Sequence, residues 1–233
     1  GPMHGIPIGV KDIYFTEDMK TTCGSPIYKS FFSNYDAKTV KALRSSGAII
    51  MGKTVTTQFA SGDPPVTKNP WNLERTPGGS SSGSAVGVAA RFFPAALGSQ
   101  TAGSVLRPAA YNGIVGFKPT YGLISESGVH PVAPSLDTVG WFTRCVKDSR
   151  LLLQNLMEFA SNTENINTSD ETSVNNDDLE DKNVRLGIIN EYYSNVVDSE
   201  SRKAFNSLIS LQTTKDVHFE ISNLDIDFDE ILA

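Results

Sequence analysis

Apolar and polar positions change their spacing several times along this chain, and each change predicts an element. Ile6–Ile13 opens with a short apolar run and is predicted to be a strand. In Asp36–Ser46 the apolar positions recur with a helical period, which predicts an amphipathic helix with Asp36 as its N-cap. Ala48–Met51 is entirely apolar and is typical of a buried strand. A helix followed by a buried strand indicates α/β layering.

The second half of the chain continues this alternation on either side of one polar segment. Asp148–Ala160 carries its apolar side chains on one face and predicts a helix. Ser161–Lys182 is almost free of apolar side chains, so burial cannot offset its ordering entropy and a mobile surface linker is expected. Further elements are predicted in the order strand, helix and strand, at Val184–Ile189, Ser199–Leu211 and Val217–Leu224. The expected fold class is α/β, with a mixed, largely buried β-sheet flanked by helices.

Residues 61–140 differ in amino-acid composition from the rest of the chain. They are dominated by Gly, Ser, Thr and Pro, and small-residue segments such as Ser84–Ala90 and Ala95–Gly98 suit close packing of backbone against backbone. Glycine also lets main-chain N–H groups come close to a reacting atom. We therefore expect the functional site to be built in this region.

Composition and charge narrow the classes of function. The 233 residues are 39% hydrophobic and 20% charged, which is ordinary for a soluble globular protein. The formal net charge of −6 argues against nucleic acid as the main partner, because a binding face would need clustered Lys and Arg. No run approaches the ~20 apolar residues of a membrane span, and no basic-plus-apolar leader opens the sequence.

Cysteine and histidine usage indicates neither disulfides nor a metal. Cys23 and Cys145 do not make a disulfide framework, and two lone thiols suit a reducing compartment, so a cytoplasmic location is expected. The three histidines are scattered and have no metal-ligand spacing. No metal site is therefore predicted.

Two short motifs suggest competing chemistries. Gly47–Thr54 (GAIIMGKT) satisfies a phosphate-binding pattern, but the four apolar residues between its glycines predict a strand, which cannot curl around a phosphate. Gly79–Gly83 (GSSSG) fits a nucleophile elbow centred on Ser81, although the residues before it favour turns over the apolar strand that an elbow needs. Nucleotide binding is disfavoured, and Ser81 stays open as an alternative nucleophile.

A third set of segments is longer, and its members follow one another in a fixed order. They are GPMHGIPIGVKD (Gly1–Asp12), TPGGSSSGSA (Thr76–Ala85), LGSQTAGSVLRPAA (Leu97–Ala110), GIVGFKPTYG (Gly113–Gly122) and SLDTVG (Ser135–Gly140). In these segments the chain resembles the amidase-signature family over residues 1 to about 160. The resemblance implies an amidase-signature catalytic core at 1–160, the polar acidic linker at 161–182 and the start of the C-terminal part of the same domain at 183–233. It also implies a truncated or fragmentary member.

The resemblance assigns a Ser–Ser–Lys triad. Lys11 is the implied base, Ser80 the bridging serine at a cis peptide bond, and Ser104, 24 residues further along, the nucleophile. Backbone N–H groups that would bind the oxyanion belong to the small residues just before the nucleophile, Thr101, Ala102 and Gly103. The implied reaction is acyl transfer from a carboxylic amide to Ser104, followed by hydrolysis, and it needs no cofactor.

This residue set suits the reaction for physical reasons. A serine hydroxyl is a poor nucleophile until a base removes its proton, and a lysine amine can be that base when burial lowers its pKa. Lys11 lies at the end of an apolar run, where it would lose solvent. The alternative is an ion pair with Asp12 or with an exposed carboxylate. Ser80 can both donate and accept a proton, although the serine-rich segment Ser80–Ser84 could equally be a turn that caps a helix.

The sequence departs from the commonest family pattern at three positions. Gln100 stands where Asp is common, Ala102 where Gly is common, and Arg107 lies one residue later than the usual Arg. A Gln100–Arg107 hydrogen bond is therefore expected in place of an Asp–Arg pair. By resemblance, this loop is more similar to free-standing amidases than to amidotransferase subunits.

The expected function is that of an amidase, which hydrolyses the carbon–nitrogen bond of a linear, small-molecule amide through a serine acyl-enzyme. A homodimer is also left open as the oligomeric state. Two alternatives stay open: a glutamine-hydrolysing A-type subunit of an amidotransferase that amidates aminoacyl-tRNA with its partners, and a truncated, non-catalytic remnant.

Overall fold

A computed structural model describes most of the chain, namely residues 1–164, 184–189, 197–210 and 217–222. The chain divides into two compact units, Gly1–Asn167 and Thr168–Ala233. The predicted functional residues all lie in the first unit. Among the described residues, no helix is both long enough and apolar enough to cross a membrane.

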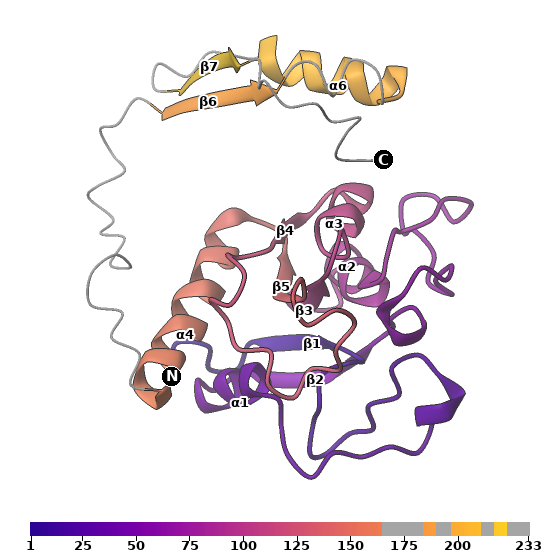
Figure 1. Ribbon diagram of the computed structural model, residues 1–233, viewed down its shortest axis with the longest axis vertical. Helices are drawn as coiled ribbons and strands as arrows, with labels where there is room; N and C mark the ends of the chain where they lie inside the picture. Colours follow the sequence, from indigo (N-terminus) through magenta and orange to yellow (C-terminus); the bar gives the residue numbers. More distant parts are fainter. Residues whose placement is uncertain (165–183, 190–196, 211–216, 223–233) are drawn as a thin grey trace. The chain divides into compact units, whose positions relative to one another are not determined.

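The first unit is built on a five-stranded mixed sheet with the order β2-β1-β3-β5-β4 (Figure 1). Its strands are β1 (Pro7–Lys11), β2 (Ile49–Thr54), β3 (Ala95–Gln100), β4 (Val115–Phe117) and β5 (Thr138–Thr143). β1 runs parallel to both β2 and β3, whereas β5 is antiparallel to β3 and β4. Because β1 and β3 are parallel neighbours, their carboxyl ends meet at one edge, with Lys11 ending β1 and Ser99 near the end of β3.

Helices cover both faces of this sheet. They are α1 (Lys38–Ser45), α2 (Ser82–Ala89), α3 (Leu106–Asn112) and α4 (Val146–Glu164), with single 3₁₀ turns at Pro26–Tyr28 and Gln58–Ala60. One buried cluster joins α1 and α4 to sheet residues such as Val10, Leu97 and Trp141. The other joins α2 and α3 to Ala96 and Phe142, the alternate positions of the same strands. The mixed α/β fold with helices on both faces is therefore confirmed.

Small residues let α2 approach the sheet closely, as the composition of this region predicts. The ring of Phe93 is wedged between Gly9 of β1 and Gly87 of α2, where an added Cβ would lie 2.5 and 2.2 Å from its Cζ. Larger residues at either glycine would push the helix away from the sheet. This packing places the start of α2, and the serines just before it, against the ends of β1 and β3.

Two local predictions are wrong. α1 begins at Lys38 with Ala37 as its N-cap, and Asp36 instead accepts the backbone N–H of Glu17 at 3.0 Å and pairs with Arg44. The predicted buried strand is an edge strand: β2 pairs with β1 alone among the described strands, and Ile49 and Met51 are 52% and 59% exposed. Successive side chains of a strand point to opposite faces, so Ile49 and Met51 share one face of β2, and that face is exposed.

The third difference concerns the end of α4. The helix continues to Glu164, so the first four residues of the predicted linker Ser161–Lys182 are helical. The remainder of that linker, 165–182, lies outside the described residues. In the second unit the predicted elements are present as β6 (Val184–Ile189), α6 (Ser199–Ser210) and β7 (Val217–Ser222), with β6 and β7 parallel. The division into domains at 160 and 182 stays a prediction.

Candidate active site

Lys11 ends β1 with its side chain wholly inside the protein. It is 0% exposed, and its Nζ donates hydrogen bonds to Ser80 Oγ at 2.7 Å and to Ser99 Oγ at 2.9 Å. The alternative of an ion pair with Asp12 is wrong, because the Asp12 carboxylate lies 3.2 Å from Lys53 Nζ and accepts hydrogen bonds from Thr22. Burial lowers the pKa of Lys11 from 10.5 to about 7, opposed by the negative charge of Asp137. An amine in this setting is partly neutral at ordinary pH.

Ser80 lies beside Lys11 in the segment that leads into α2. Its side chain is buried, and the peptide bond between Gly79 and Ser80 is cis, as the family resemblance implies. The Gly79 carbonyl oxygen accepts hydrogen bonds from Arg107 Nη2 at 2.9 Å and Nε at 3.3 Å. The structure therefore brings Lys11 and Ser80 into direct contact and ties the preceding peptide to α3.

Ser81 does not form a nucleophile elbow. Its hydroxyl is fully buried, donates to the Ser99 carbonyl oxygen at 3.2 Å and accepts the Ser99 N–H at 3.3 Å. It is also the N-cap residue of α2 without a capping hydrogen bond from its side chain. Ser84 likewise donates to Leu97 O at 2.7 Å. The hydroxyls of Ser81 and Ser84 therefore anchor α2 to β3 rather than capping the helix as a serine-rich turn would.

Ser104 lies in the loop between β3 and α3, half buried. Among the described residues its hydroxyl has no hydrogen-bond partner, and no hydrogen bond joins it to Ser80. The backbone N–H groups of Thr101, Ala102 and Gly103 likewise have no acceptor within that part of the chain. The loop thus presents a hydroxyl and consecutive N–H groups whose hydrogen-bonding capacity is unused, as an acyl-transfer site requires.

The expected Gln100–Arg107 hydrogen bond is wrong. Gln100 Oε1 accepts the N–H groups of Val105 and Leu106, both at 2.9 Å, and so satisfies the first donors of α3. Arg107, one residue later than in the common pattern, turns its guanidinium to Gly79 instead. Its own backbone N–H donates to the Gly103 carbonyl oxygen at 2.9 Å. Arg107 therefore contacts both of the segments that carry the two candidate serines.

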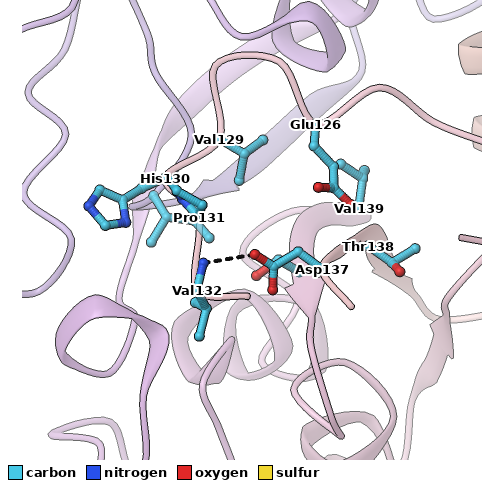
Figure 2. Close-up of a pocket in the computed structure, with 10 residues that line it drawn as sticks. Glu126, Val129, His130, Pro131, Val132, Asp137, Thr138 and Val139 are labelled. Atoms are coloured by element: carbon cyan, nitrogen blue, oxygen red, sulfur yellow. Dashed lines mark hydrogen bonds between the residues drawn. The ribbon is translucent and has the colours of Figure 1, made fainter. Parts of the chain in front are cut away.

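Two polar residues beyond the predicted set complete the site. Ser99 accepts from Lys11, and Asp137 accepts a hydrogen bond from Thr101 Oγ1 and two more, from Val132 N at 2.7 Å and Ala133 N at 3.0 Å. Both line a cavity of about 120 Å³ that Glu126 also faces (Figure 2). The only sequence signal for Asp137 was its place in SLDTVG, and Ser99 carried none, because both contacts depend on the pairing of β3 with β1 and β5.

The residues that match the phosphate-binding pattern form part of the sheet, and the lysine of the pattern is bonded within the protein. Gly47–Thr54 consists of a turn and the strand β2, as its apolar residues predict. Lys53 Nζ donates to Tyr14 O at 2.6 Å and Thr21 Oγ1 at 2.8 Å in addition to its pair with Asp12. The described residues also include no group of three or more His, Cys, Asp or Glu side chains placed to hold a metal ion.

Comparisons with known proteins point to one family. The family model described as Amidase matches residues 1–227. The A-type subunit of glutamyl-tRNA(Gln) amidotransferase from Carboxydothermus hydrogenoformans is 40% identical over 229 residues, which cover 94% of this chain and 47% of that protein. The protein of the same name from Symbiobacterium thermophilum is 51% identical over 160 residues, 66% of this chain and 33% of its own. The chain therefore spans about half the length of these relatives, or less.

Solved structures give the same result. A crystal structure described as an amidase matches 96% of this chain with a TM-score of 0.82 and 32% identity. Native peptide amidase from Stenotrophomonas maltophilia matches 96% with a TM-score of 0.80 and 30% identity. The A-type subunit of glutamyl-tRNA(Gln) amidotransferase from Thermotoga maritima matches 95% with a TM-score of 0.79 and 33% identity. In each case the match covers about half of the other chain: 49, 49 and 51% respectively.

Proposed function

The chain belongs to the amidase family, and from this premise we propose that it carries the acyl-transfer site of an enzyme that cleaves a carboxylic amide. Ser104 is the nucleophile of the proposed reaction, Ser80 relays protons and Lys11 is the base. The observation that carries this proposal is the 2.7 Å hydrogen bond from the fully buried Lys11 Nζ to Ser80 Oγ. An amine held beside a hydroxyl, out of water and without a hydrogen-bonded carboxylate, is suited to take up a proton at neutral pH.

The proposed reaction begins with acylation of Ser104. Neutral Lys11 takes the proton of Ser80 while Ser80 takes that of Ser104, and Ser104 Oγ forms a bond to the amide carbon. The carbonyl oxygen becomes an oxyanion near the free N–H groups of Ala102 and Gly103, a type of interaction worth ~3–4 kcal/mol of barrier. As the intermediate collapses, the carbon–nitrogen bond breaks and the proton returns through Ser80 to the leaving nitrogen.

Deacylation uses the same groups with water as the nucleophile. The relay removes a proton from water, the water oxygen bonds to the acyl carbon, and the ester bond to Ser104 breaks as that proton reaches its Oγ. The products are a carboxylic acid and ammonia or an amine, and no cofactor is consumed. Hydrogen bonds of this kind commonly close only when substrate is bound, which is compatible with the unbonded Ser104 hydroxyl.

A second candidate differs in the fate of the nitrogen. The identity of 40 to 51% to proteins named as A-type subunits of glutamyl-tRNA(Gln) amidotransferase favours a subunit that hydrolyses glutamine and passes ammonia to partner proteins. The match to a peptide amidase structure and the resemblance of the Gln100-containing loop support a free-standing amidase. Both candidates share the cleavage at Ser104. The cytoplasmic location, the homodimer and the absence of a nucleic-acid partner stay predictions.

Covalent labelling tests the shared chemistry without knowledge of the substrate. A fluorophosphonate should modify the protein, and peptide mapping should place the adduct on Ser104, with none in a Ser104→Ala variant. An adduct on Ser81 would contradict the assignment of the nucleophile. A folded protein that takes no label would favour the non-catalytic remnant.

Ammonia release distinguishes the two candidates. The free-standing amidase should release ammonia from simple linear amides when it acts alone. The amidotransferase component should act on glutamine in preference to such amides, and its turnover should rise when partner proteins and acceptor tRNA are added. Equal turnover with and without those partners would count against the second candidate.

A further inference from the structure

Asp137 lies just before β5 and links two segments of the site, the loop 101–104 (the oxyanion loop) and Val132–Ala133. Its side chain is buried, and its two oxygens accept three hydrogen bonds: one from Thr101 in the oxyanion loop, and one each from the N–H groups of Val132 and Ala133. Figure 2 shows the Asp137 carboxylate at the wall of the cavity, joined to Val132. A buried carboxylate bound by three donors has a fixed position and brings its negative charge to a fixed place.

We propose that Asp137 is a positioning residue for the reaction at Ser104: it holds Thr101, and with it the oxyanion loop, and places one negative charge in the buried surroundings of Lys11. The proposal deepens the proposed function and rests on it. Thr101 is three residues before Ser104, and among the described residues the N–H groups of Thr101 to Gly103 have no acceptor, whereas the Gly103 carbonyl oxygen accepts the Arg107 N–H at 2.9 Å. The Thr101–Asp137 hydrogen bond therefore holds the start of this loop, and the Gly103–Arg107 hydrogen bond holds its end.

The charge of Asp137 acts on the base. Burial lowers the pKa of Lys11 to about 7, and the negative charge of Asp137 opposes this fall. The neighbours of Lys11 that donate or accept directly, Ser80 and Ser99, are uncharged. The other nearby acids act elsewhere: Asp12 pairs with Lys53, and Glu126 lies across the cavity, where burial and Asp137 raise its own pKa. His130, which also lines the cavity, packs its ring against Tyr28 and Phe59.

The two roles predict separate kinetic effects. Loss of the hydrogen bond to Thr101 should loosen the oxyanion loop and lower the maximal rate at Ser104. Loss of the charge should lower the pKa of Lys11, since a nearby anion favours the protonated amine. A residue with a merely structural role could lower the maximal rate, but it would not move the pH at which that rate is reached.

The test is the pH dependence of fluorophosphonate labelling at Ser104 in the whole protein, for three variants. Asp137→Asn should lower the plateau rate and move the apparent pKa from about 7 to lower pH by about 1 unit. Thr101→Val, which breaks the same contact and keeps the charge, should lower the plateau by about 10- to 100-fold at an unchanged apparent pKa. Glu74→Gln removes the charge of an exposed acid that does not line the cavity, and it should leave both quantities as in the wild type.

The outcomes separate this inference from the proposed function. A wild type that takes no label would overturn the proposed function. A labelled wild type with an unmoved apparent pKa in folded Asp137→Asn, or an equal shift in Glu74→Gln, would overturn the inference alone. If Asp137→Asn does not fold, Thr101→Val decides, and a plateau within about twofold of the wild type would contradict the positioning role.

Discussion

At the scale of single residues, the chemistry of this site depends on the burial of the Lys11 side chain away from water. Its amine is fully buried, and its hydrogen-bond acceptors among the described residues are two hydroxyl oxygens. The protonated form is therefore disfavoured, and the pKa falls to about 7. A surface lysine, in contrast, would stay protonated and could not accept a proton from serine. Burial is thus the property that makes this amine a base.

The same burial should make stability depend on pH. Between the folded pKa of about 7 and the unfolded value of 10.5, the unfolded chain binds a proton that the folded chain does not, so this residue makes the free energy of unfolding rise with pH across that window. Lys11→Met removes the effect. In urea unfolding, the free energy of unfolding of Lys11→Met should therefore exceed that of the wild type most near about pH 7. This difference should be smaller at about pH 9.5.

The matched control is Lys41→Met, which changes an exposed lysine of α1 in the same way. A difference in unfolding free energy between Lys11→Met and the wild type that stays constant with pH would mean that Lys11 keeps its proton in the folded protein. That result would remove the basis for its role as a base.

Local sequence predicts part of this site and not the rest. Lys11, Ser80 and Ser104 are identified because each stands in a long motif whose order the family keeps, and burial of Lys11 follows from the apolar run before it. Ser99 and Asp137 are missed because their contacts form only when β3 pairs with β1 and β5. The Gln100–Arg107 prediction is wrong for a related reason. Both side chains form hydrogen bonds with backbone groups instead, and a sequence pattern does not reveal such bonds.

At the scale of elements, the site depends on the close approach of α2 to the sheet. The glycines that permit this approach, Gly9 and Gly87, both contact the ring of the buried Phe93. Neither glycine has a positive φ, so their backbone conformation does not require glycine. What requires glycine is the lack of space for a Cβ atom beside the Phe93 ring. The sequence predicts such packing from its small residues, whereas it does not predict which glycine faces which side chain.

Gly87→Ala should therefore destabilise the protein, although alanine is the better helix former. The helix would gain about 1 kcal/mol from the change, whereas overpacking against Phe93 costs about 1–3 kcal/mol in a filled core. Overpacking is the larger effect, so Tm should fall. The control is Gly62→Ala, where an added Cβ meets nothing within 4 Å and Tm should hold or rise. In the double variant Gly87→Ala with Phe93→Leu, the smaller side chain should restore stability. An unchanged Tm in Gly87→Ala alone would contradict this account, because it would show that α2 can shift freely.

At the scale of the whole molecule, topology brings together residues that lie far apart in the chain. Lys11 and Ser80 are 69 residues apart, and Lys11 and Ser99 are 88 apart, yet both pairs are hydrogen bonded. Ser99 is brought to Lys11 because β1 and β3 are adjacent and parallel, and Ser80 because α2 packs against both strands. Alternating patterns predict the α/β layers, but they contain no information on strand order. The central claim, that Lys11 acts on Ser104 through Ser80, is a claim about this long-range arrangement.

The most direct test of that claim is the pH dependence of Ser104 labelling in the wild type and in Lys11→Arg. The wild-type rate should rise with pH through an apparent pKa of about 7 and then level off, because only neutral Lys11 accepts a proton. Lys11→Arg should be slower by about 10²–10⁴-fold and should lack this rise, since a guanidinium stays protonated at any usable pH. A folded Lys11→Arg variant that labels at close to the wild-type rate would contradict the account.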